Sequence, residues 1–370
     1  MKVLEIIYSL SSGGAERFVV DLSNELAELK NSVVLCTLLD DSKKNNGFYK
    51  PEISAKVMYQ NLRLKEGFRI LDIYYLWKLI NDTKPDIVHC HLAVVFYLLP
   101  LSVIFPKMKF FHTIHNDAPR EVSSKLQYYL RRFFYSYGII QSITISNETT
   151  QSFIKYYKSQ RYCQIYNGRK QPAPSSEFEN VKGFIDTIRT KSKTIFLHVG
   201  RYAEQKNQHM LIKVFNQIIK EGKSVALLII GDGFEKPKGV ELKAMASDMI
   251  YFLGLKQNVV DFYLNSDAFC LSSFHEGMPI TLIEAFACGC IPVCTPVGGI
   301  SDSIQNGITG YLSKSVSEED YYNAVMSYIN NKDKINKEHL VEYYKSKFGI
   351  RECATQHLKL FNSKNTRKKL

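Results

Sequence analysis

Hydrophobic and polar positions alternate along the first half of the chain in a way that predicts strands and helices in turn. Short apolar runs are typical of strands buried on both faces, and apolar residues spaced by three and four are typical of helices packed on a sheet. The predicted strands are 3–8, 32–39, 86–89 and 109–114, and the predicted helices are 15–30 and 71–81. This alternation favours a parallel sheet covered by helices.

A second series of the same kind follows an interruption. The stretch 172–176, Pro-Ala-Pro-Ser-Ser, is typical of a linker. The predicted strands beyond it are 194–199, 224–230, 249–253, 268–271 and 291–294, with a helix at 209–221. Because 370 residues suit two domains of ordinary size, we expect an α/β protein of two parallel-sheet domains, residues 1–171 and 181–343, joined by a linker at 172–180.

Three features of the sequence indicate the cellular compartment of the protein. The uncharged stretch 92–105 contains Pro100 and is shorter than the roughly 18 to 20 residues of a membrane-spanning helix, so we expect a buried helix there. The first ten residues run into a predicted strand without a cleavage site, so no secretory signal is expected. The eight cysteines lie mostly in apolar segments and lack zinc-type spacing, as core residues of a reducing compartment do. We therefore expect a cytoplasmic protein.

The net charge of +12 indicates a polyanionic neighbour. Between residues 120 and 170, basic residues far outnumber the acidic Glu121 and Glu148 and alternate with tyrosine and phenylalanine. Such a segment can lie on anionic lipid at the inner membrane face, and a helix with a solvated basic face and a buried aromatic face accounts for it equally well. Nucleic acid is a weaker interpretation, because no nucleic-acid-binding module is present.

The most informative span is 269–299. A predicted strand ends at Ser272 and Ser273, and a predicted helix at 281–287 ends before Gly289. At the start of that helix, backbone amides would be available to bind a phosphate. The stretch that would provide them consists of Met278, Pro279, Ile280, Thr281 and Leu282. Glu276 would precede the helix and Glu284 would lie in its first turn, and carboxylates bind the hydroxyls of sugars well. An exposed loop acid and an ordinary first-turn acid explain the spacing alone about as well.

Further motifs accompany this span in a fixed order. They are Gly13-Gly14-Ala15-Glu16, 85–91, Thr113-Ile114-His115, Asn167-Gly168, Val199-Gly200-Arg201 with Lys206-Asn207, Gly231-Asp232-Gly233, 252–254, Ser266-Asp267, Glu276 with Glu284, and 295–299. Together they resemble the retaining nucleotide-sugar glycosyltransferases of the GT-B fold, glycosyltransferase family 4 in particular. The resemblance implies two Rossmann-like domains facing across a cleft, with residues 344–370 returning to the first domain.

The resemblance also implies a hexosyl- or N-acetylhexosaminyltransferase that builds a cell-surface polysaccharide from a nucleotide sugar, with UDP-sugar expected, on a saccharide or lipid-linked acceptor. Two alternatives stay open. One is an epimerase or phosphorylase of the same fold, although neither extra acids nor a pyridoxal-binding lysine stands out. The other is a non-catalytic nucleotide-sugar binding protein, which the joint presence of Arg201, Lys206, Glu276 and His115 argues against.

Two cations are candidates for stabilising the leaving group. Arg201 and Lys206 follow the predicted strand 194–199, and fixed positive charge favours a phosphate that gains negative charge in the transition state. No Asp-x-Asp pair suggests a metal, so we expect a site without metal or other cofactor. Gly13 and Gly14 lie between a strand and a helix, where a diphosphate or sugar can approach the backbone.

His115 follows the predicted strand 109–114 and, by the resemblance, lies beside the transferred sugar and contacts one of its hydroxyls through its backbone carbonyl or ring. His112 should point elsewhere because strand residues alternate. His89 and His91 share one strand face, which can indicate metal, but no third ligand is evident and packing is favoured.

The remaining roles also come from the resemblance. The leaving phosphate takes the proton of the acceptor hydroxyl on the same face of the sugar, while Glu276 holds sugar hydroxyls and Glu284 the ribose. The base is contacted by backbone near 252–256, including Leu255. Arg169 and Lys170 depart from the family pattern after Asn167-Gly168 and add positive charge near the hinge.

Overall fold

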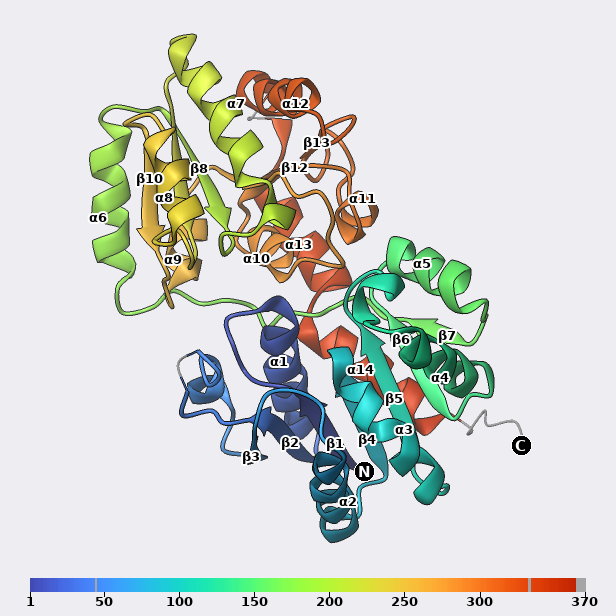
Figure 1. The fold of residues 1–370 in the computed structure, drawn as a ribbon. Helices are drawn as coiled ribbons and strands as arrows, with labels where there is room; N and C mark the ends of the chain where they lie inside the picture. The colour runs from blue at the N-terminus through green and yellow to red at the C-terminus, as the bar shows by residue number, and fades with distance from the viewer. Residues whose placement is uncertain (44, 332–333, 364–370) are drawn as a thin grey trace. The chain divides into compact units, whose positions relative to one another are not determined.

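The computed structural model describes residues 1–43, 45–331 and 334–363. The chain divides into two compact units, one formed by Met1–Lys170 with the segment from Phe348 onward, and the other by Gln171–Lys347. Each unit is built on its own parallel sheet with helices packed against it (Figure 1). The predicted fold class, α/β with two Rossmann-like domains, is confirmed.

The sheet of unit 1 has the order β3-β2-β1-β4-β5-β6-β7, and every neighbouring pair is parallel. Its strands are β1 (Lys2–Ile7), β2 (Ser32–Leu39), β3 (Val57–Leu64), β4 (Ile87–His91), β5 (Lys109–Ile114), β6 (Ile140–Thr144) and β7 (Tyr162–Gln164). Its helices are α1 (Gly14–Glu28), α2 (Ile70–Thr83), α3 (Val95–Ile104), α4 (Lys125–Ser136), α5 (Asn147–Tyr157) and α14 (Ile350–Asn362).

The sheet of unit 2 has the order β10-β9-β8-β11-β12-β13, also parallel throughout. Its strands are β8 (Thr194–Val199), β9 (Val225–Ile230), β10 (Ile250–Gly254), β11 (Ala268–Leu271), β12 (Ile291–Cys294) and β13 (Tyr311–Leu312). Its helices are α6 (Phe178–Arg189), α7 (Gln208–Lys220), α8 (Pro237–Ala244), α9 (Val259–Asn265), α10 (Ile280–Ala287), α11 (Gly299–Ser303), α12 (Glu318–Asn331) and α13 (Lys337–Lys347).

The buried central strands carry the clearest sequence signal. All six residues of β9 are buried, as expected of a strand covered on both faces. The strands absent from the sequence prediction are β3, β6, β7 and β13. Most of them are short or lie at a sheet edge, where polar residues replace the apolar run that marks a central strand.

The chain leaves unit 1 after Lys170 and re-enters it at Phe348, later than the expected return at Tyr344. Tyr344 is buried in α13, which packs against α10 inside unit 2. Arg169 and Gly349 form a parallel bridge, so the outgoing and returning segments are hydrogen-bonded to each other within unit 1. The expected linker also ends early, because α6 begins at Phe178.

Within the described part of the chain, no helix has the length and apolar character needed to cross a bilayer. The stretch 92–105 forms a short 3-10 turn, Leu92–Val94, followed by α3, in which most side chains are buried. The prediction of a buried helix is confirmed there, with Pro100 inside the helix.

Candidate functional site

The predicted site residues of unit 2 gather where β8, β9, β10 and β11 end. The loops after β8 and β9 meet closely, because a Cβ on Gly231 would collide with the carbonyl oxygen of Gly200. The amide of Tyr202 donates to Asp232 O at 2.7 Å, and the amide of Gly231 donates to Gly254 O at 3.0 Å. The glycine motifs of the sequence therefore bring three loops together at the carboxyl edge of the sheet, where parallel α/β sheets bind ligands.

Lys206 meets Glu276 at this edge because β8 and β11 are neighbours in the sheet. The Nζ atom of Lys206 lies 2.7 Å from Oε1 of Glu276, and both side chains are largely buried. Their loops are also joined directly: the amide of Phe274 donates to Gln205 O at 2.8 Å, and Gln205 Nε2 donates to His275 O at 2.8 Å. The ion pair is thus held by two hydrogen-bonded loops.

The two oxygens of Glu276 have different surroundings. Oε1 accepts from Lys206 and also from Ser273 Oγ at 2.6 Å. Among the described residues, none is hydrogen-bonded to Oε2. One face of the carboxylate is fixed by protein and the other can accept from a ligand hydroxyl.

The start of α10 differs from the sequence prediction in two respects. The helix begins at Ile280, so Glu284 lies in its second turn and not in its first. The amide of Leu282 already donates to Pro279 O at 3.1 Å, and Pro279 carries no amide hydrogen. Within the predicted stretch, the amides that this helix start can present to an anion are therefore those of Ile280 and Thr281. Met278, beside them, is buried.

A pair of glycines supports the loop of Glu276 from behind. Gly298 has φ of +57°, and a Cβ there would collide with the carbonyl oxygen of Glu276. Gly299 donates its amide to Gly277 O, and Thr295 Oγ1 donates to Ser273 O at 2.7 Å. The motif at 295–299 is thus explained by close backbone packing, which only glycine permits at position 298.

Arg201 and Leu255 lie on the surface of unit 2. Arg201 is exposed beside the loop contact of Gly200 and Gly231, and Leu255 is 45% exposed after the end of β10. Both follow strand ends of the same sheet edge as Lys206 and Glu276. They are open to a ligand rather than committed to the core.

In unit 1, Gly13 and Gly14 begin α1 directly after the loop that follows β1. A Cβ on Gly13 would collide with the carboxylate of Glu16, which folds back over the helix start and accepts from Ser11 Oγ at 3.0 Å. Because this carboxylate is the end of a flexible side chain that can move aside, packing favours Gly13 without requiring it. The Gly13 backbone lies at the carboxyl edge of the unit 1 sheet.

His115 follows β5 and is buried with 7% of its surface exposed. Its ring Nε2 lies 3.0 Å from Nδ1 of His91, and its backbone amide donates to Glu121 Oε1 at 2.9 Å. Burial lowers the pKa of His115 to about 3, so the ring is neutral. His112 points elsewhere as predicted, with Nδ1 2.8 Å from Tyr135 OH.

His89 and His91 have a third partner that the sequence prediction missed. Glu5 on the neighbouring strand β1 lies 2.9 Å from each ring and is fully buried with them. These three groups are close enough for their ligand atoms to hold a metal ion. The signal was available in the charged residue inside the apolar run of the first strand, because a buried acid needs partners.

The segment 120–170 is less uniformly basic at the surface than its sequence indicates. Arg131 on α4 is 1% exposed and lies 3.7 Å from the carboxylate of Glu121. Burial raises the pKa of Glu121 to about 7. Arg131 is therefore part of the core and is not available to a lipid headgroup.

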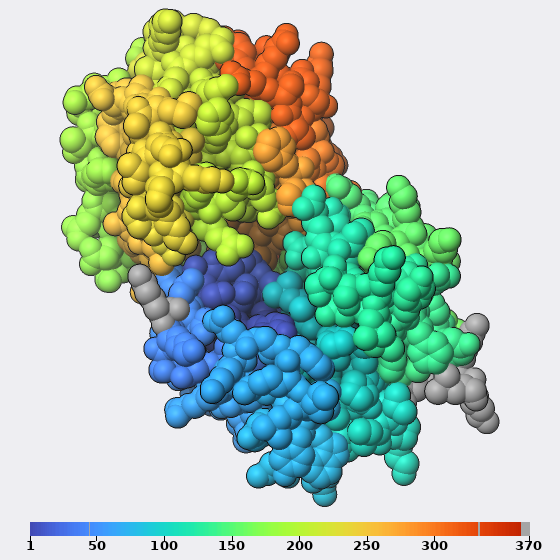
Figure 2. All heavy atoms as spheres, in the orientation of Figure 1, coloured from blue at the N-terminus to red at the C-terminus, as the bar shows by residue number. Residues whose placement is uncertain are grey.

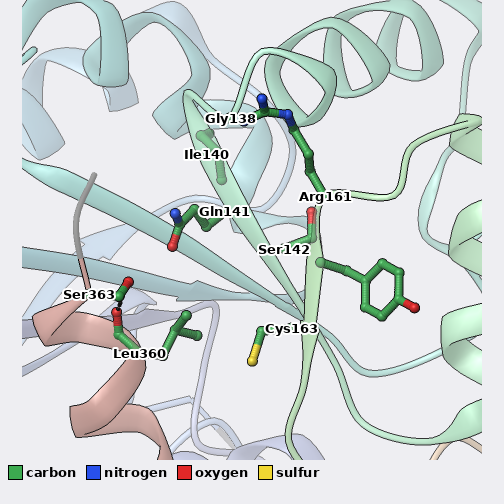
Figure 3. Close-up of a pocket in the computed structure, with 9 residues that line it drawn as sticks. Gly138, Ile140, Gln141, Ser142, Arg161, Cys163, Leu360 and Ser363 are labelled. Atoms are coloured by element: carbon green, nitrogen blue, oxygen red, sulfur yellow. Dashed lines mark hydrogen bonds between the residues drawn. The ribbon is translucent and has the colours of Figure 1, made fainter. Parts of the chain in front are cut away.

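A hollow of about 440 Å³ lies elsewhere on unit 1 (Figure 3). It is lined by residues near the amino ends of β6 and β7 and by Leu360 and Ser363 at the end of α14. His115 follows the carboxyl end of a strand in the same parallel sheet, so the hollow and His115 belong to opposite edges. None of the predicted site residues lines this hollow.

Both halves of the chain match family models. Residues 12–169 match the model described as Glycosyltransferase Family 4, and residues 184–347 match the model described as Glycosyl transferases group 1. Each match lies within one of the two units, and together the matches include the positions of every predicted site residue.

Individual relatives agree with these matches. An uncharacterized glycosyltransferase of Methanocaldococcus jannaschii is 27% identical over 318 residues, covering 74% of this chain and 76% of the relative. The UDP-Gal:α-D-GlcNAc-diphosphoundecaprenol α-1,3-galactosyltransferase of Escherichia coli is 25% identical over 320 residues, covering 82% and 79%. An Anabaena protein solved in complex with UDP and glucose has the same fold, with a TM-score of 0.77, 17% identity and coverage of 97% and 99%.

Proposed function

The chain belongs to the glycosyltransferases of family 4 with the GT-B fold, and from this premise we propose that it transfers a hexosyl or N-acetylhexosaminyl group from a UDP-sugar, with retention of configuration, to a lipid-linked saccharide. The Escherichia coli relative, whose name states a UDP-sugar donor and a diphosphoundecaprenol-linked acceptor, supports both substrates. The Anabaena structure with UDP and glucose supports the nucleotide.

The observation that carries the proposal is the Lys206–Glu276 pair at the carboxyl edge of the unit 2 sheet. The pair combines a fixed ammonium group with a carboxylate that has one oxygen free of protein partners, so it can bind both the phosphate and the hydroxyls of a sugar phosphate. The cation stabilises the charge that grows on the departing diphosphate, and the free carboxylate oxygen accepts from a hydroxyl of the sugar. The exposed Arg201 and the amides at the start of α10 add donors for the diphosphate.

In this scheme Glu276 positions the sugar and is not a nucleophile. Oε1 of Glu276 is occupied by Lys206 and Ser273, which fixes the carboxylate and reduces its tendency to attack carbon. The leaving phosphate oxygen accepts the proton of the acceptor hydroxyl as the new glycosidic bond forms on the same face of the sugar. Lys206 and Arg201 provide the positive charge that a divalent metal provides in other transferases, so the reaction proceeds without a metal cofactor.

A surface of unit 1 suits the lipid carrier of the acceptor. The exposed apolar side chains on and beside α2, α3 and α4 are Phe68, Ile70, Leu71, Tyr74, Tyr75, Val103, Ile104, Leu126, Tyr129, Phe133 and Tyr137. α3 packs against both α2 and α4, and Figure 2 shows this blue-to-teal part of unit 1 turned toward the viewer. Lysine and arginine side chains in the same segments, among them Lys78, Lys125 and Arg132, suit anionic headgroups.

The proposal is tested with a panel of UDP- and GDP-sugars. Thermal stabilisation by UDP, together with transfer from one UDP-sugar to a polyprenyl-diphosphate saccharide, is the expected result. Glu284→Ala should chiefly weaken UDP binding, and Glu276→Ala should chiefly reduce turnover. If a nucleotide sugar binds but is neither transferred nor slowly hydrolysed, the protein is a non-catalytic binding protein. If no nucleotide stabilises the protein, the assignment is overturned.

A further inference from the structure

Three strand residues of unit 1, Glu5, His89 and His91, and His115, which follows β5, form one continuous hydrogen-bonded network. Glu5 on β1 lies between the rings of His89 and His91 on β4, which is its neighbour in the sheet. The Nε2 atom of His91 is 2.9 Å from Glu5 Oε2, and its Nδ1 atom is 3.0 Å from Nε2 of His115. These hydrogen bonds therefore lead from a fully buried carboxylate to His115, the histidine that by the family resemblance lies beside the transferred sugar.

The rings in this network are neutral. Burial lowers the pKa of His89 and of His115 to about 3 and places the pKa of His91 well below its ordinary value. Phe18 covers the rings of His91 and His115 at centroid distances of 6.0 and 5.7 Å and adds no polar group. Each imidazole therefore carries one N–H and one lone pair.

Glu5, the acceptor at the start of this hydrogen-bonded network, sets the direction of the hydrogen bonds that lead to His115. A carboxylate only accepts, so His91 donates to Glu5 through Nε2 and keeps a lone pair on Nδ1. That lone pair accepts from His115, whose single proton must then be on Nε2. Nδ1 of His115 keeps a lone pair, and among the described residues it has no hydrogen-bonded partner in the structure.

We propose that Glu5 is a positioning residue that acts through His91 to hold His115 in the tautomer protonated on Nε2. This inference depends on the proposed function and on the role that the family resemblance implies for His115, beside the transferred sugar. In that tautomer the free Nδ1 accepts a hydrogen bond from a sugar hydroxyl, whereas the opposite tautomer would place two lone pairs, on His91 Nδ1 and His115 Nε2, against each other.

The second branch from Glu5 provides a control within the same network. His89 donates to Glu5 through Nδ1, and its Nε2 lies 2.7 Å from the hydroxyl of Thr113. A hydroxyl can donate or accept, so Thr113 accommodates whichever tautomer of His89 the side chain at position 5 selects. The branch to His115 has no such freedom, because both of its members are imidazoles.

The first test is a measurement on the wild-type protein, and a variant serves only to assign its spectra. Long-range ¹H–¹⁵N correlation spectra of the histidine-labelled protein, assigned with His115→Gln, distinguish the two tautomers. The expected result is His115 protonated on Nε2 and neutral at pH 7. A proton on Nδ1 of His115 would overturn the proposal, and so would a stoichiometric metal ion found by elemental analysis, since His91 would then bind metal through Nε2 and donate from Nδ1.

The second test separates positioning from a merely structural role. Glu5→Leu should lower kcat about 10- to 100-fold with UDP affinity unchanged, as expected for one lost hydrogen bond to the reacting sugar. Glu5→Gln should restore kcat, because its amide oxygen can accept from His91 while its NH₂ group donates to His89 and Thr113 accepts in turn. Thr113→Val, on the other branch, should keep the wild-type kcat.

Each outcome is decisive. A Glu5→Gln variant as slow as Glu5→Leu, or a Glu5→Leu variant with wild-type kcat, would contradict the proposal. If Glu5→Leu does not fold, the tautomer of His115 in the wild-type protein still decides the matter. Absence of any transfer by the wild-type protein would count against the proposed function and leave the tautomer measurement unaffected.

Discussion

Lys206 Nζ lies 2.7 Å from Glu276 Oε1, although the two residues are 70 positions apart in the chain. The contact arises because β8 and β11 are adjacent and parallel, so the loops that follow them leave the same edge of the sheet. The side chains are only 18% and 7% exposed, so the charges are little screened by water.

Replacing Lys206 with Gln should therefore reduce kcat by about 10²- to 10³-fold, the range found when one preorganised donor to a developing negative charge is lost. The affinity for UDP should fall much less, because the charge on the phosphate is greatest in the transition state. Steady-state kinetics with the active UDP-sugar, together with calorimetric titration of UDP, measure the two effects. Equal losses in kcat and UDP affinity would show that Lys206 contributes only to ground-state binding.

The packing of Gly298 against the Glu276 loop gives a second prediction. Gly298→Ala places a methyl group against the carbonyl oxygen of Glu276 at a φ of +57° and should displace this loop. We expect a loss of kcat together with a lower melting temperature. Gly307→Ala is the matched control, since Gly307 also has positive φ, +77°, but a Cβ there meets no atom within 4 Å.

The two variants should thus share the backbone strain, about 1 kcal/mol, and differ in the steric contact. A Gly307→Ala variant with normal kcat and a Gly298→Ala variant with reduced kcat would support the interpretation of the 295–299 motif as the support of Glu276. Equal kcat in both would contradict it.

Much of this arrangement could be predicted from the sequence, and the reasons for success and failure are physical. The central strands were visible because burial on both faces requires continuous apolar runs. The gathering of Lys206 and Glu276 at one edge followed from their positions after strands of a parallel sheet. The position of Glu284 was wrong by a turn because helix boundaries depend on backbone geometry that spacing does not fix.

The network of Glu5 shows a different limit. Pairing of β1 with β4 brings Glu5 beside His89, and this pairing cannot be read from either strand alone. In the same way, Arg131 is one more basic residue of a basic segment in the sequence. Only the folded structure shows that it is buried beside Glu121. Buried polar partners come from different elements, so the sequence shows the need for a partner but not its identity.

Acid should destabilise the protein below about pH 6.5. Six of its nine histidines are buried, and burial lowers the pKa of each: His89, His91, His112, His115, His198 and His357. Above their ordinary pKa of 6.5 these groups are neutral in both states. As the pH falls, the unfolded chain binds protons that the folded protein excludes, so stability is lost toward the folded pKa values near 3 to 4.

Glu121 opposes this trend over the same range. Burial raises its pKa from 4.5 to about 7, so the folded protein holds a proton there that the unfolded chain has released. Its contribution to stability is present below pH 4.5 and is lost as the pH rises through 7. The free energy of unfolding should therefore fall between pH 6.5 and 5 by more than about 1.4 kcal/mol per pH unit, the slope for a single proton. Glu121→Gln should steepen the fall, and a flat profile from urea denaturation would contradict the buried neutral histidines.

The ion pair of Asp21 and Arg169 gives the last prediction. Arg169 Nη1 lies 2.7 Å from Asp21 Oδ2, and both side chains are 4% exposed. Asp21 also accepts from the amide of Lys170, so α1 is joined to the segment by which the chain leaves unit 1. Asp21→Asn keeps an acceptor for Lys170 but leaves the buried guanidinium without its counter-charge, which should cost about 3–5 kcal/mol.

The loss should be local to unit 1, where α1 and α14 pack together. Hydrogen exchange of the α1 amides in native conditions measures it without requiring that the whole chain unfold in one step. Glu28→Gln is the matched control, because Glu28 and its partner Lys56 are 48% and 61% exposed and such pairs contribute little, about 0–1 kcal/mol. Equal protection of α1 in the two variants would show that the Arg169 charge is compensated elsewhere, and stronger exchange in Asp21→Asn alone would establish Asp21 as the anchor of the outgoing segment.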